Sequence, residues 1–192
     1  AVRSSGYVPG FAKVSGALAA DQNGGSLILR ADASTVEMPE LLVEPLPLDA
    51  LNAKVSWSML GGQPLVRLES LAFANAHMEG RFAGTYEAQA QGPGRIDVAG
   101  ALARLEGAEL WRYVPTMVHP DVRDWLRTAI GSGQFLDARV TLRGDLQRFP
   151  VADGKGGVFE VGSRMQNGTL AYAPGWPALE DISGTLRVQG PR

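Results

Sequence analysis

Alternation between apolar and polar residues runs through most of this chain and limits what it can fold into. In 25–33, Leu27 and Leu29 fall on one face and Arg30 on the other, and 137–146 repeats the pattern. Side chains of a β-strand point alternately to the two faces of a sheet. The sequence therefore predicts about nine strands, each with one apolar and one polar face, joined by glycine-rich turns.

One stretch has the period of a helix. Five apolar residues at 122–130 follow the spacing i, i+3, i+4, i+7 and i+8, which places them on one helical face. Pro120 suits the first turn of such a helix, and a second short helix is expected to end before Pro115. The face is predicted to pack on the sheet, with membrane or partner contact as alternatives. Its residues are Val122, Trp125, Leu126, Ala129 and Ile130.

The pattern of residues 48–57 returns in 179–188, at an offset of 131. Each copy reads as a strand that follows a proline-containing crossover, and such duplication is typical of elongated repeat proteins. We therefore divide the chain into a β repeat unit (1–106), a helical insertion (107–133) and a second β repeat unit (134–192). The second unit is expected to continue beyond residue 192, as part of a longer protein.

The apolar strand faces need a cover. A helix of ten residues is about 15 Å long, which is too short to cover nine strands spaced about 4.8 Å apart. Two arrangements remain open. The sheet folds on itself as a sandwich, the arrangement that the strand pattern alone favours, or it curves into a trough whose apolar floor receives an apolar ligand.

Composition and motifs argue against several function classes. The formal net charge is −2, which gives no basic field for nucleic acid, and no apolar run approaches the ~20 residues of a membrane-spanning helix. The chain has no cysteine. We expect no catalytic residue, metal ion or cofactor. His77 and His119 lack companion motifs, and the sequence at 153–157, DGKGG, is predicted to be a hairpin turn.

Two further features are assigned structural roles. The acidic residues Glu37, Glu40 and Glu44 are too few for a hard-cation site, so we expect a solvated crossover. Trp176, between Gly175 and Pro177, is predicted to be an aromatic plug of its crossover.

In combination, several motifs resemble the AsmA-like YhdP family of Gram-negative bacteria. No single motif is specific, but their order is. The motifs are YVP (113–115), VRDWLRTAIGSG (122–133), ARVTLRGDLQRFPV (138–151), GVFEVGSRMQNGTLAYAPGWP (157–177) and ISGTLRVQG (182–190). The N-terminal half is similar in style.

The resemblance implies a mainly β fold, a curved antiparallel sheet of repeated units that forms a groove, with one or two short helices around 107–131. It implies a periplasmic part of an inner-membrane-anchored protein that is not an enzyme. Such a protein carries phospholipid between inner and outer membranes and maintains the outer-membrane permeability barrier. Other envelope proteins are expected partners at its ends. The alternative function is a closed, sandwich-like structural or protein-interaction module without lipid.

The strand alternation and this resemblance together predict a lipid groove. Its floor is expected to consist of the apolar residues of successive strands: Leu27, Leu29, Val55, Trp57, Phe82, Val98, Val140, Leu142, Phe159, Val161, Leu170, Ile182 and Leu186.

Overall fold

The computed structural model describes residues 9–116, 118–148, 157–173 and 175–190. Strands make up 66% of the described residues and helices 12%, which confirms the mainly β prediction. The strands are β1 (Gly10–Ala12), β2 (Ser15–Ala20), β3 (Gly24–Glu37), β4 (Leu46–Leu60), β5 (Gln63–Ala74), β6 (Met78–Glu87), β7 (Arg95–Glu106), β8 (Ile130–Asp145), β9 (Gly157–Leu170) and β10 (Leu179–Gln189).

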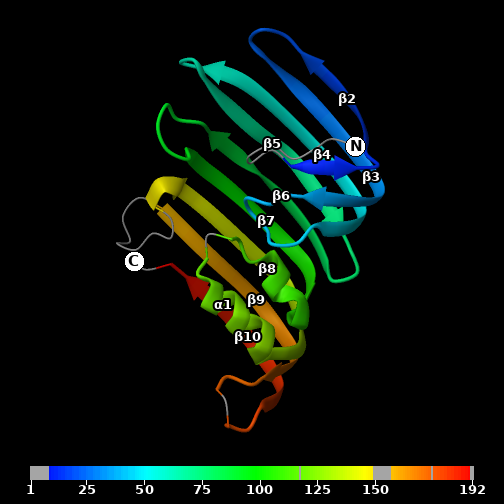
Figure 1. Ribbon diagram of the computed structural model, residues 1–192, viewed down its shortest axis with the longest axis vertical. Helices are drawn as coiled ribbons and strands as arrows, with labels where there is room; N and C mark the ends of the chain where they lie inside the picture. Colours follow the sequence, from blue (N-terminus) through cyan, green and yellow to red (C-terminus); the bar gives the residue numbers. More distant parts are fainter. Residues whose placement is uncertain (1–8, 117, 149–156, 174, 191–192) are drawn as a thin grey trace.

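All ten strands belong to one antiparallel sheet (Figure 1). From β3 to β10, each strand pairs with its neighbours in the sequence, while β1 and β2 both pair with β3. The sheet is open and curved, and the strands do not divide into two packed layers. The trough is therefore the arrangement that this chain adopts, and the sandwich alternative is wrong.

The connection between β7 and β8 contains two helices, η1 (Gly107–Tyr113) and α1 (Pro120–Ala129), and a short turn η2 (Leu146–Arg148) follows β8. Pro120 stands in the first turn of α1, as predicted, and the His119 ring accepts a hydrogen bond from the Asp121 N–H. Ile130 differs from the prediction because it is the first residue of β8. Strand β8 thus begins inside the range assigned to a helical insertion.

Along a strand, residues on the apolar face are normally two positions apart in the sequence. In several strands this spacing is three positions at one point. Such a step is a β-bulge, where one extra residue bends the strand. It follows Leu102 in β7 and Phe135 in β8, where the strand registers shift. In β8 the extra residue is Asp137, whose φ is 51°. These bulges provide the local bends that a curved sheet requires.

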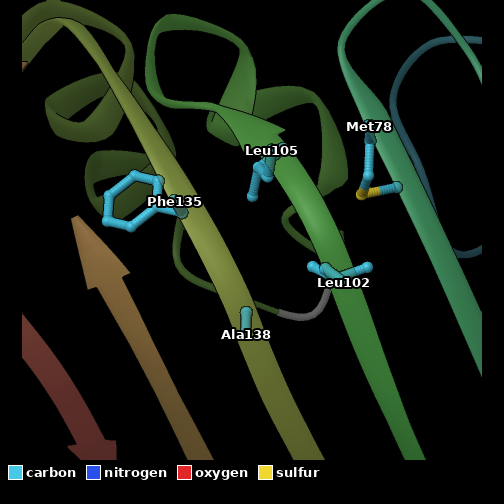
Figure 2. Close-up of a cluster of buried hydrophobic side chains, with 5 residues drawn as sticks. All are labelled: Met78, Leu102, Leu105, Phe135 and Ala138. Carbon is cyan, nitrogen blue, oxygen red and sulfur yellow. The ribbon is translucent and has the colours of Figure 1, made fainter. Parts of the chain in front are cut away.

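The buried residues gather at one end of the sheet. One cluster consists of Met78, Leu102, Leu105, Phe135 and Ala138, which project from β6, β7 and β8 (Figure 2). A second consists of Ala31, Val36, Leu48 and Leu51 on β3 and β4. Because all these residues lie at the strand ends that meet η1 and the β3–β4 loop, the core is confined to this end. We call it the covered end, and the opposite end the open end.

The side chain of Asn75 links three elements at the covered end by hydrogen bonds. Its Oδ1 accepts hydrogen bonds from the N–H groups of His77 and Met78, at 2.9 and 2.7 Å. Its Nδ2 donates to the Pro47 carbonyl and to the Tyr113 hydroxyl, each at 3.1 Å. The β5–β6 turn, β4 and η1 therefore share one buried amide.

We expect Asn75→Ala to lower the free energy of unfolding by about 2 kcal/mol, because buried N–H and C=O groups lose their partners. Urea denaturation measures the change. Tyr113→Phe is the matched control, since it removes only one of these partners, and it is expected to cost about 1 kcal/mol or less. An equal loss in the two variants would contradict the central position of Asn75.

Candidate functional site

The strand registers assemble most of the predicted groove residues into two neighbouring rows that cross the sheet. Side chains at paired positions lie on the same face, about 5 Å apart. The first row is Leu29, Ala53, Leu71, Phe82, Gly100, Val140, Val161 and Val188. The second row is Leu18, Leu27, Val55, Leu68, Gly84, Val98, Leu142 and Phe159.

These rows hold nine of the thirteen predicted residues, and Trp57 belongs to the next row toward the open end, where it pairs with Val66. The other three lie elsewhere on β9 and β10. Leu186 is opposite the buried Ser163, Ile182 is opposite Gly168, and Leu170 pairs with Leu179 beside α1. The structure therefore places a continuous apolar band along the sheet and puts Leu170 and Ile182 at the covered end.

The two rows remain accessible from solvent. None of the predicted groove residues is fully buried, and Val188 of the first row is 42% exposed. Leu18 on β2 is 68% exposed. At the covered end of the same face, by contrast, Leu105 is 4% exposed. One face of the sheet thus has a closed part, which holds the fold together, and an open apolar part.

Several residues of the rows were not among the predicted groove residues. Leu68, Leu71 and Val188 lie in alternating stretches, so their spacing was a sufficient signal. Leu18 was missed because the short strand β2 carries the small residues Gly16, Ala17 and Ala19 and has no strong alternation. Only its pairing with Leu27 in β3 places it in the second row.

Gly100 allows close packing of side chains in the first row. A Cβ atom at this position would lie 2.2 Å from the Phe82 ring, so the glycine leaves room for that ring to lie across β7. The ring also stacks on Phe73, with 6.1 Å between the ring centres. The apolar band is therefore built from aromatic and branched side chains that lean over small residues.

We expect Gly100→Val to displace the Phe82 ring and to lower the free energy of unfolding by about 1–3 kcal/mol, as overpacking does. Thermal or urea denaturation measures the loss. Gly162→Ala is the control, because a Cβ at Gly162 meets nothing within 4 Å. A loss in the control as large as in Gly100→Val would show that the close approach to Phe82 is not the cause.

The connection between β7 and β8 contacts the loops on both sides of it. Toward the β3–β4 loop, the Thr116 N–H donates to the Leu41 carbonyl at 2.9 Å, and the Thr116 hydroxyl donates to the Glu40 carbonyl at 2.7 Å. Toward the β9–β10 loop, the Ala171 N–H donates to the Ala129 carbonyl at 2.8 Å. The loops and the two helices thus form a linked border along the covered end.

Charged residues support this border. Arg112 pairs with Glu44 of the β3–β4 loop and with Glu109 of η1, and its guanidinium lies over the Trp111 ring, 4.8 Å from the ring centre. The hydrogen bond with Glu109 raises the pKa of Arg112. Burial raises the pKa of Tyr113. Glu44 therefore has an ion-pair role, within the solvated crossover that the sequence predicts.

The predicted packing face of α1 is only partly covered. Ala129 is buried and Leu126 is half-buried, whereas Val122 and Trp125 are each 45% exposed. The Trp125 indole N–H donates to the Tyr172 carbonyl at 3.3 Å. Trp176 is 65% exposed and contacts the Tyr172 ring. It is therefore not the buried plug that the sequence predicts, because the loop places it outside the cover.

The described residues include no group of three or more His, Asp or Glu side chains arranged to hold a metal ion. Within the same residues, no helix has the length and apolar character needed to cross a membrane. His77 lies in the β5–β6 turn and His119 caps α1. Apart from Gly157, the predicted turn at 153–157 lies outside the described residues.

Comparison with known proteins adds the family. A model of the YhdP protein family matches residues 1–192. The chain belongs to the YhdP family. A curated relative, the intermembrane phospholipid transporter YhdP of Escherichia coli (strain K12), is 27% identical over 180 residues, which are 91% of this chain. The chain spans 14% of that YhdP protein's length. No solved structure matches it.

Proposed function

We propose that this chain is part of an apolar track along which phospholipid passes between the inner and outer membranes. The observation that carries the proposal is the pair of apolar rows, which run across the sheet and stay open to solvent. Membership of the YhdP family supports it. In this proposal the protein is periplasmic, anchored in the inner membrane, and supports the outer-membrane permeability barrier.

The energetics of a lipid in water favour such a surface. An acyl chain that leaves a bilayer exposes its methylene groups at about 0.8 kcal/mol each. Each row runs from strand to strand across the sheet. An acyl chain that slides along a row therefore keeps apolar contacts as it passes from one strand to the next. The headgroup stays in water at the open end. No chemical step and no cofactor are needed.

The alternative function is a protein-interaction module that binds no lipid. It shares the family and the fold with the track, so lipid contact must distinguish the two. A photoreactive amino acid at Leu142, in the second row, is expected to cross-link to phospholipid in cells. The matched control is Thr141, the preceding residue of β8, whose side chain lies on the opposite face.

Mass spectrometry of the purified cross-linked protein gives the result. Phospholipid attached at Leu142 and not at Thr141 supports the track. Equal labelling at the two positions, or attachment of protein alone at Leu142, would contradict it.

A further inference from the structure

The face opposite the apolar rows, here called the polar face, carries arginines in a regular line. Arg81 on β6, Arg139 on β8 and Arg187 on β10 occupy one cross-strand row. The residues between them in this row are Ala101 on β7 and Gly162 on β9. Because neighbouring strands are about 4.8 Å apart, the arginine backbones follow one another at about 10 Å, separated by residues without bulk.

A hollow of about 280 Å³ lies between the first two arginines. Ala101 and Ala103 of β7 line it, with Arg81 on the strand to one side and Arg139 on the strand to the other. A water molecule occupies about 30 Å³ of liquid, so a group of several heavy atoms fits. Both arginine side chains are exposed and long enough to reach over the alanines.

The two arginines at the hollow are not paired with the carboxylates that border it. Among the described residues, neither Arg81 nor Arg139 forms an ion pair or a side-chain hydrogen bond. Two carboxylates border the hollow. Asp137 is paired with Arg164. Glu79 forms no ion pair with a described residue and is the unpaired carboxylate at the hollow, so it opposes an anion.

We propose that this hollow binds a phosphate-type oxyanion between the guanidinium groups of Arg81 and Arg139. A guanidinium presents paired N–H donors that match two oxygens of a phosphate, and two of them on either side can hold one anion over Ala101. The hollow lies on the face away from the apolar rows. It would therefore not hold the headgroup of a lipid lying on those rows, and the inference is independent of the proposed function.

Inorganic phosphate is the first probe. In the purified protein with ¹⁵N-labelled arginine, titration at constant ionic strength is expected to shift the Arg81 and Arg139 Nε–H signals together, with saturation in the millimolar range. Arg81→Gln and Arg139→Gln are each expected to weaken the binding by about tenfold, the effect of one lost charge-assisted contact. Glu79→Gln is expected to strengthen it.

Arg143→Gln is the matched control, because Arg143 lies on the same face of β8 and is paired with Asp97 at 2.9 Å. Phosphate binding by this variant should be unchanged, and all variants should melt as the wild type does. Absence of a saturable shift at Arg81 and Arg139, or an equal loss in Arg143→Gln, would overturn the proposal.

A second arm identifies the source of the phosphate. Vesicles of phosphatidylcholine are compared with vesicles in which half of it is replaced by phosphatidylglycerol. Binding only to the anionic vesicles, and lost in Arg81→Gln, would assign the site to a membrane-borne phosphate. A response to inorganic phosphate without vesicle binding would assign it to a soluble one.

Discussion

Leu142→Asp is expected to block phospholipid transport while the chain still folds. Leu142 is half-buried in the second apolar row, between Val98 and Phe159. Without lipid, the new carboxylate can stay hydrated, so we expect the free energy of unfolding to fall by about 1 kcal/mol. An acyl chain that passes this position must remove that water, and an unpaired carboxylate then costs several kcal/mol.

Two measurements are needed on the same variant. Thermal denaturation of the purified chain reports folding, and outer-membrane permeability in cells with the variant as their only copy reports transport. Leu186→Asp, at a position 40% exposed, tests a second point of the same face. Both variants should retain a melting transition close to that of the wild type and should give a leaky outer membrane.

Two control variants place the same carboxylate in the core and on the polar face. Leu105→Asp places a carboxylate on the same face but in the covered core, where the side chain is 4% exposed, so it should prevent folding. Thr141→Asp places it on the polar face and should leave both folding and permeability unchanged. If Leu142→Asp unfolds the chain as Leu105→Asp does, the apolar rows are a closed core and the track is excluded.

Much of the apolar band was readable from the sequence, because alternation alone fixes which residues of one strand share a face. The β8 residues Val140 and Leu142, and Val98 of β7, are predicted and found on one face. Strand residues with a positive φ interrupt such predictions. Simple alternation puts Ala33 on the face of Ala31, but Ala33 has a φ of 55°, and the residue that follows Ala31 on this face is Ser34.

What covers an apolar face is a property of distant contacts, which periodicity does not contain. Thr116 bonds to Glu40 and Leu41, 76 and 75 residues earlier in the chain. The sequence predicts the helix but not that its connection joins two loops along one border. The arginine row could not be predicted for the same reason. That Arg81 and Arg139 lie on either side of Ala101 follows from the strand registers, which periodicity does not contain.

The division of the apolar face into a covered and an open end leads to a second large effect. Phe135→Ala is expected to lower the free energy of unfolding by about 3–5 kcal/mol, the usual cost of removing a buried phenylalanine ring. Phe135 is 5% exposed and packs with Met78, Leu105 and the partly buried Leu110 of η1. Its loss leaves a cavity beneath the helix that closes this end. Urea denaturation of the purified chain measures the change.

Phe159→Ala is the matched control, because Phe159 has the same side chain and lies on the same face, but toward the open end. Phe159 is only partly buried, so its removal is expected to cost less than half as much, about 1–2 kcal/mol of transferred apolar surface. The two ends differ in this test because only one of them excludes water. Equal losses would mean that the open end is as closely packed as the covered end, and acyl chains would then have no free surface to follow.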